Sequence, residues 1–170
     1  MRFVTAITTF ALMIGAQAIH QMNLRNNCGF AVELKLSNWP GHPPYTGPAI
    51  GGLSAKTSKT ITVPDGWDGR ICDAAGGCGG GDCYGKCLMT EFNMNAGGLN
   101  YYDISNIQAY TVHQRIEASG CQTVTCTSPS CPCYQAYGIG NTAGTWPGSS
   151  TPDRAVKACG MANFTITYCP

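Results

Sequence analysis

The chain has little charge, because only 11% of its 170 residues are Asp, Glu, Lys or Arg. Its 10 basic and 9 acidic residues are scattered along the sequence and form no runs. A balanced, scattered charge gives no basic footprint for nucleic acid and none for an anionic membrane surface. We therefore expect neither kind of partner.

Long apolar runs are also lacking, apart from one at the beginning of the chain. Arg2 is followed by a mostly apolar run over residues 3–16 and by the A-x-A sequence of residues 16–18. This arrangement is typical of a secretory signal peptide, cleaved after residue 18. The run is too short and too rich in Thr and Ala to span a bilayer. We expect residues 19–170 to form one secreted, soluble, monomeric domain without a membrane span.

No internal repeat and no sustained helical periodicity is present. Short segments instead alternate between apolar and polar residues, which is the pattern of strands with one buried face. The 22 Gly and 10 Pro separate these segments and are typical of turns and surface loops. The pattern predicts an all-β protein, an antiparallel β-sandwich or flattened barrel. The expected strands are residues 22–28, 31–37, 57–63, 67–72, the two halves of 91–107, 110–116 and 163–168.

Motifs for nucleotide binding or nucleophilic catalysis are absent from the sequence. Five glycines occur among residues 76–81, but no Lys-Ser or Lys-Thr follows them, so a phosphate-binding loop is excluded. No Ser-His-Asp or Cys-His order stands out. His113 falls on the polar side of the alternating segment 110–116, which indicates a solvated sheet residue. No cofactor is expected.

Two acidic residues in the segment 91–107 are the candidate functional groups. Glu91 and Asp103 fall on two short β-type segments joined by the turn Gly97-Gly98, and the segment carries no other charge. Two carboxylates on neighbouring strands can bind sugar hydroxyls or perform acid–base chemistry on a glycosidic bond. The same spacing also fits ordinary acids that accept hydrogen bonds from the local backbone, and by spacing alone that interpretation is the more common one.

Cysteine is abundant, with 11 residues. In the oxidising compartment that a signal peptide implies, these are expected to form disulfides. Cys72, Cys78, Cys83 and Cys87 are separated by five, four and three residues, so they do not form the paired C-x-x-C of a zinc site and no metal is expected. The odd number leaves one thiol. It is free, bridges to another chain, or belongs to a local rearrangement of the C-P-C sequence at residues 131–133.

The order of several short motifs resembles the thaumatin-like (osmotin) family. Asn27-Cys28 is followed by D-C-Y-G-K-C at residues 82–87, E-F at 91–92, Y-D-I-S-N-I at 102–107 and a closing Y-C-P at 168–170. The resemblance covers nearly all of the chain after the signal peptide. It implies a thaumatin-like β-sandwich with disulfide-pinned loops. The length matches small family members, in which most of the disulfide-rich second domain is missing.

The resemblance also implies disulfide pairs that the spacing leaves open. C-P-C-Y-Q-A-Y at residues 131–137 stands where the family has C-P-D-A-Y, so Cys131 is the closer match and Cys133 is left unpaired. The implied pairs are Cys28–Cys169, Cys72–Cys78, Cys83–Cys87, Cys121–Cys159 and Cys126–Cys131. Independently of the family, Asn163-Phe164-Thr165 is the only N-glycosylation sequon, with Asn163 on the polar face of the last strand.

The resemblance further implies a cleft in which Glu91 and Asp103 match two of the family's acids. They are therefore the candidate glycan-binding and catalytic residues. Gln108 and Cys133 stand where the family has two further acids, and the family's arginine is missing from residues 88–90. These departures and the reduced second domain are expected to open the cleft to water. An open, less acidic cleft works against the raised pKa that a general acid needs.

Two functions from different classes follow. The first is a secreted protein that binds cell-wall polysaccharide, β-1,3-glucan, with an antifungal, defence-type or wall-modifying role and at most weak endo-β-1,3-glucanase activity. The alternative is a non-catalytic module that binds a foreign hydrolase or a surface protein at the host–microbe boundary. Such a module would use the loops around Trp39 and Tyr45.

Overall fold

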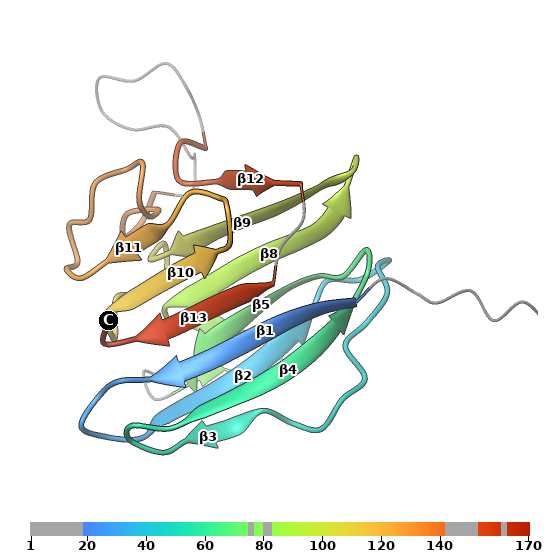
Figure 1. Cartoon of the computed structure of the whole chain (residues 1–170). Helices are drawn as coiled ribbons and strands as arrows, with labels where there is room; N and C mark the ends of the chain where they lie inside the picture. The colour runs from blue at the N-terminus through green and yellow to red at the C-terminus, as the bar shows by residue number, and fades with distance from the viewer. Residues whose placement is uncertain (1–18, 75–76, 80–82, 142–152, 161–162) are drawn as a thin grey trace, which may run out of the picture.

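The computed structural model of the chain describes residues 19–74, 77–79, 83–141, 153–160 and 163–170. The expected signal peptide, residues 1–18, lies outside the described residues. Within the described ranges all the named elements are strands, and none of these residues forms a helix of the length and apolarity needed to cross a membrane. The strands form two sheets that pack face to face (Figure 1), so the predicted all-β sandwich is confirmed.

The first sheet has five strands in the order β11-β10-β13-β1-β4. β1 runs parallel to β13, and the other neighbours are antiparallel. The strands are β1 (Ile19–Asn26), β4 (Ser58–Pro64), β10 (Gln114–Ala118), β11 (Val124–Cys126) and β13 (Phe164–Tyr168).

The second sheet has six strands in the order β12-β9-β8-β5-β2-β3, all antiparallel. A short hairpin, β6–β7, forms a third, two-stranded sheet. The strands are β2 (Val32–Asn38), β3 (Gly51–Leu53), β5 (Asp68–Asp73), β6 (Cys78–Gly79), β7 (Tyr84–Gly85), β8 (Met89–Ala96), β9 (Leu99–Ser105) and β12 (Lys157–Cys159).

Aromatic side chains join the two large sheets across the core. Phe164 of β13 packs edge-on against Phe92 of β8 and Tyr102 of β9, with ring centroids 5.3 and 5.1 Å apart. Trp67, just before β5, stacks on Phe92 at 6.1 Å. All four side chains are buried. Removing each of them from water stabilises the fold by about 1.5–3 kcal/mol, and the contacts fix one sheet against the other.

One predicted strand begins later than the alternation suggested. Residues 110–116 alternate as expected, with Val112, Gln114 and Ile116 buried and His113 exposed, but the β10 ladder starts only at Gln114. The chain before it is held by other bonds: the His113 carbonyl accepts a hydrogen bond from the Cys169 amide at 2.9 Å. The alternation therefore predicts the buried face correctly but places the start of the strand too early.

The hairpin that joins β8 to β9 turns at Gly97-Gly98, as the sequence predicts. Both glycines have left-handed backbone angles, with φ of 62° and 84°, and Ala96 pairs with Leu99 across the turn. A two-residue turn of this kind matches the right-handed twist of the flanking strands. The turn, with a register shift between Asn93 and Ala96, sets which residues of β8 and β9 stand opposite one another.

Three disulfides are the pairs that the family resemblance implies, and Cys133 is unpaired among the described cysteines. The bond with the largest sequence separation, 141 residues, joins the loop after β1 to the end of the chain. The chain-entropy model gives such a closure about 5 kcal/mol of stabilisation. The three pairs are Cys28–Cys169, Cys121–Cys159 and Cys126–Cys131.

The other two pairs differ from those implied, so Cys72–Cys78 and Cys83–Cys87 are corrected. The structure joins Cys72 to Cys83 and Cys78 to Cys87. The register of the β6–β7 hairpin explains why the partners differ. Cys78 stands opposite Gly85, which places it close to Cys87, two residues further along the chain. Cys83 then faces the end of β5, where Cys72 lies. The four half-cystines form one buried cluster over this end of the sheet.

Candidate functional site: an acidic row on the six-stranded sheet

The candidate acids lie on the face of the six-stranded sheet that points away from the core. Arg70 of β5 stands opposite Glu91 of β8, and Glu91 stands opposite Asp103 of β9. These residues form one row across three neighbouring strands. The adjacent row, which contains Ile71 and Ile104, turns its side chains into the core. Because side chains alternate between the two faces of a strand, Arg70, Glu91 and Asp103 share the outer face.

Asp103 is the buried member of the row. The residue is 8% exposed, and its Oδ1 atom has no hydrogen-bond partner among the described residues. Burial raises the pKa of its carboxyl well above the ordinary value, and the negative charges of Glu91 and Asp153 raise it further, while Arg70 and Lys157 oppose the shift. The expected opening of the cleft to water therefore does not extend to Asp103, whose burial favours a raised pKa.

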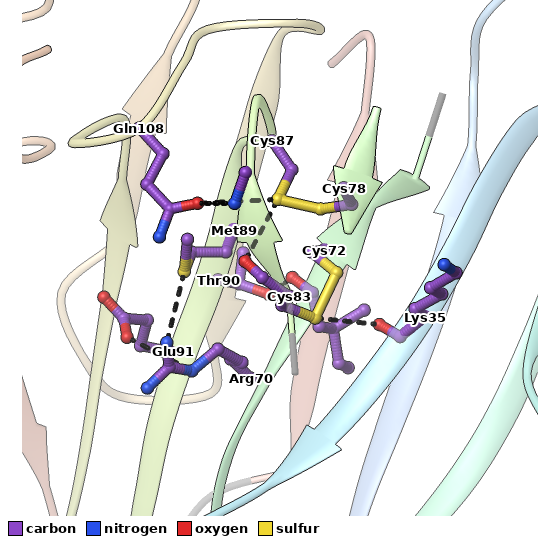
Figure 2. Close-up of a disulfide and its surroundings, with 12 residues drawn as sticks. Lys35, Arg70, Cys72, Cys78, Cys83, Cys87, Met89, Thr90, Glu91 and Gln108 are labelled. Carbon is purple, nitrogen blue, oxygen red and sulfur yellow. Dashed lines mark hydrogen bonds and ion pairs between the residues drawn. A yellow bond between two sulfur atoms is a disulfide. The ribbon is translucent and has the colours of Figure 1, made fainter. Parts of the chain in front are cut away.

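Glu91 is more accessible and has a basic partner. Its Oε1 atom lies 3.7 Å from Nε of Arg70, with the two side chains 29% and 13% exposed. Figure 2 shows this pair in the same region of the sheet as the disulfides Cys72–Cys83 and Cys78–Cys87. An arginine is thus present at the site, contributed by β5 and not by the three residues before Glu91. Its place depends on how β5 pairs with β8, which no local pattern in the sequence reveals.

A third acid, Asp153, was missed by the sequence analysis. Its Oδ1 atom accepts a hydrogen bond from the Tyr137 hydroxyl at 2.5 Å, and its charge acts on Asp103. Tyr137 itself is fixed beside the end of β9, because its amide donates to the Ile104 carbonyl at 2.9 Å and its carbonyl accepts from the Asn106 amide at 3.1 Å. Burial first, and then the hydrogen bond to Asp153, raise the pKa of Tyr137.

The two positions at which this chain departs from the family's acids have separate surroundings. The Gln108 side-chain oxygen accepts a hydrogen bond from the Gly85 amide at 2.6 Å, so it attaches the β6–β7 hairpin to the rest of the fold. Cys133 is half-buried. Burial and the Arg154 charge lower the pKa of Lys157, and Asp103 and Cys133 oppose that shift.

Of the two loop aromatics noted in the sequence, only Trp39 contacts a residue of the row. The guanidinium carbon of Arg70 lies 5.2 Å from the centroid of the Trp39 ring and 5.2 Å from that of Tyr84. Tyr45 instead donates its hydroxyl to the Pro48 carbonyl at 2.8 Å. It lines a groove of about 590 Å³ beside β2 and β3.

Two further sequence predictions have a place in the structure. Asn163 is exposed, but its Oδ1 atom accepts a hydrogen bond from the Gln21 amide at 3.0 Å, which holds the start of β1; its glycosylation stays a prediction. The sulfur atoms of Cys72, Cys78 and Cys87 lie within 4.8 Å of one another. Each of these atoms is part of a disulfide, so none is a thiolate that could hold a metal.

Fold and site together define a class of protein: a β-sandwich tied by five disulfides, with a row of acids on the outer face of its larger sheet. No family model matches the chain. It is 34% identical to a thaumatin-like protein of wheat (Triticum aestivum), over 87% of each chain. It is 30% identical to thaumatin-like pathogenesis-related protein 2 of oat (Avena sativa), over 98% of each chain.

Among solved structures, the thaumatin-like xylanase inhibitor superposes with a TM-score of 0.61 at 17% identity, covering 88% of this chain and 99% of the inhibitor. At that identity the likeness speaks for the fold alone. The sequence relatives decide the family: this chain belongs to the thaumatin-like, pathogenesis-related proteins. The resemblance seen in its motifs is confirmed.

Proposed function

We propose that this chain binds a cell-wall polysaccharide, β-1,3-glucan, at the row Arg70–Glu91–Asp103, in a defence or wall-modifying role with at most weak hydrolysis. One observation carries the proposal: Glu91 and Asp103 stand directly opposite each other on neighbouring strands. Such a pair is a costly arrangement, because each carboxylate raises the free energy of the other. A sheet face that only had to be solvated would gain nothing from it.

The chemistry of the row suits the hydroxyl groups of a neutral sugar. Glu91 offers carboxylate oxygens that accept hydrogen bonds, and Arg70 offers N–H groups that donate them. Their mutual distance of 3.7 Å leaves both with hydrogen-bonding capacity for a ligand. Asp103 lies deeper and acts on the ligand through its effect on Glu91.

Two features of the acid pair favour hydrolysis, and two others limit it. The Cβ atoms of directly opposite residues lie about 4.5–5.5 Å apart, which is close to the carboxyl separation of about 5–5.5 Å in retaining glycosidases. The raised pKa of Asp103 also suits a proton donor. However, Asp103 is almost completely buried, so its proton has no direct route to a glycosidic oxygen, and Glu91 is engaged by Arg70. We therefore expect binding to exceed cleavage.

Secretion is part of the proposal. Residues 1–18 have the pattern of a signal peptide, and we propose that residues 19–170 act as one extracellular domain after its removal. The five disulfides support this, because disulfides persist in oxidising compartments.

Retention on insoluble β-1,3-glucan tests the proposal. Glu91→Gln removes the accessible charge without changing the shape of the side chain, and we expect it to weaken retention about tenfold, the loss of one charge-assisted hydrogen bond. Glu117→Gln is the matched control, since Glu117 is exposed on β10 and pairs with Arg115 in the other sheet. Equal retention of wild type and Glu91→Gln would contradict the proposed site. Release of reducing sugar from the same polymer measures hydrolysis.

A second candidate function is inhibition of a foreign hydrolase. It is favoured by the half-exposed Trp39 on the loop after β2, since exposed aromatic residues are enriched in protein interfaces. The similarity to a xylanase inhibitor in fold agrees with it. Assays of microbial xylanases and β-glucanases with and without the protein distinguish the two functions. Inhibition that Trp39→Ala abolishes and Glu91→Gln leaves intact would favour the inhibitor.

A further inference from the structure

Two half-exposed aromatic rings flank Arg70 at the edge of the acidic row. We infer that Trp39, Arg70 and Tyr84, called here the aromatic platform, form a stacking surface for consecutive sugar rings of a polysaccharide. The inference rests on the proposed glycan binding and extends the site beyond its acids. Its occupant is a neutral β-linked glycan chain, not a single sugar and not a protein.

The geometry of the platform is set by one side chain. Each ring centroid lies 5.2 Å from the guanidinium carbon of Arg70, so the two centroids are separated by no more than twice that distance. The Arg70 side chain is only 13% exposed, whereas Trp39 and Tyr84 are 46% and 47% exposed. The surface that the platform offers to solvent is therefore mainly aromatic, with a small part of Arg70 between the rings.

Separate parts of the fold restrain the backbone that carries the two rings. The Trp39 amide donates to the Asp68 carbonyl at 2.8 Å, which ties the residue after β2 to the start of β5. Tyr84 lies on β7, between the half-cystines Cys83 and Cys87, and the next residue is bonded to Gln108. A ring on a restrained backbone loses little conformational freedom when a ligand stacks on it, which favours binding. Rigid exposed rings beside a polar site are typical of a ligand surface.

A sugar ring fits both chemistries that meet here. One face of a pyranose is made of C–H groups, which pack on an aromatic ring, while its edge carries hydroxyls. Arg70 belongs to both parts of the site, because the same guanidinium group lies over the two rings and beside Glu91. A chain whose sugars stack on the rings therefore presents its hydroxyls to the acidic row. Two rings engage more than one sugar, so affinity should rise with the length of the glycan.

Depletion isotherms on insoluble β-1,3-glucan, xylan and cellulose test the inference. We expect Trp39→Ala and Tyr84→Ala each to weaken binding about tenfold, and Trp39→Phe and Tyr84→Phe to restore most of it. Phe30→Ala is the control, because Phe30 is exposed in the loop between β1 and β2 and belongs to no part of the platform. If an alanine variant unfolds at the assay temperature, the leucine variant, which keeps apolar bulk without a ring, replaces it.

The outcomes separate this inference from the proposed function. If Glu91→Gln loses binding to β-1,3-glucan and both alanine variants bind like wild type, the platform is overturned and the function stands. If wild type binds only xylan or cellulose and needs both rings, the platform stands and the β-1,3-glucan proposal fails. Binding of wild type to none of the three polymers overturns both. Loss of hydrolase inhibition in Trp39→Ala, with glycan binding unchanged, also overturns the platform.

Discussion

At the scale of single residues, the site contains carboxyl groups close enough to repel one another when ionised. Asp103 is buried against Glu91, and Asp153 adds a third negative charge nearby. Arg70 and Lys157 offset part of this repulsion. The arrangement disfavours the ionised form of Asp103, so proton binding there is linked to the stability of the folded protein.

Asp103→Asn should therefore change how stability depends on pH. In the unfolded chain the pKa of this carboxyl is about 3.9, and in the folded protein burial raises it. Between these two values the folded state binds more protons, so the free energy of unfolding of the wild type falls as the pH rises through that window. Asparagine carries no charge to bury, so we expect the variant to gain stability relative to wild type by up to about 1.4 kcal/mol per pH unit there.

Urea unfolding at pH 4, 5, 6 and 7 measures this difference. At pH 4, close to the pKa of the unfolded carboxyl, only about half of the unfolded chains carry the charge, so the two proteins should differ least at the acidic end of this range. Glu117→Gln, at an exposed acid, serves as the control and should show no such trend. A difference between Asp103→Asn and wild type that stays constant from pH 4 to pH 7 would show that burial of Asp103 does not raise its pKa.

At the scale of elements, the acidic row depends on the turn between β8 and β9. Gly97 and Gly98 both have φ in the left-handed region, and nothing lies within 4 Å of a Cβ added to either. A substitution there acts through backbone strain and not through a clash. Because a slip of one residue turns every side chain to the other face of the sheet, the turn decides whether Glu91 meets Asp103.

Substitutions in this turn should separate strain from sterics. Gly98→Ala is expected to lower the free energy of unfolding by about 1–2 kcal/mol, the cost of a left-handed residue with a Cβ. Gly97→Asn should be close to neutral, because Asn-Gly is a preferred pair in two-residue hairpin turns. Urea unfolding of both variants checks the pair. An equal loss in the two would mean that the hairpin turn is not of this type.

The elements also show why sequence predicts some features and not others. The strands with clear alternation, and the turn at Gly97-Gly98, were found because their signals are local. β3, β11 and β12 have three residues each, too few to form a pattern. The position of Arg70 opposite Glu91 and the exchange of partners among Cys72, Cys78, Cys83 and Cys87 depend on pairing between segments, which local periodicity does not encode.

At the scale of the whole molecule, the two ends of the described chain are held together. β1 pairs in parallel with β13, so the first and last strands lie side by side in the same sheet (Figure 1). Cys28–Cys169 then closes this pairing covalently. The five-stranded sheet, on which the six-stranded sheet packs, therefore has the first and last described strands next to each other near its centre. Its integrity is a precondition for the candidate site, because Phe164 of β13 supports Phe92 and Tyr102 on the strands that carry the acids.

Removing this disulfide should therefore cost more than removing a short one. In the chain-entropy model, replacing Cys28 and Cys169 by serine costs about 5 kcal/mol, whereas replacing Cys126 and Cys131 costs about 2 kcal/mol. The difference arises because the sequence separations are 141 and 5 residues, and the entropy of loop closure grows with the length of the loop. Thermal and urea unfolding of the two double variants under non-reducing conditions measure it. If the variant lacking Cys126–Cys131 is the less stable of the two, local packing outweighs chain entropy in this fold. The first and last described strands would then be held chiefly by their own pairing, and the candidate site would keep its geometry without the longest crosslink.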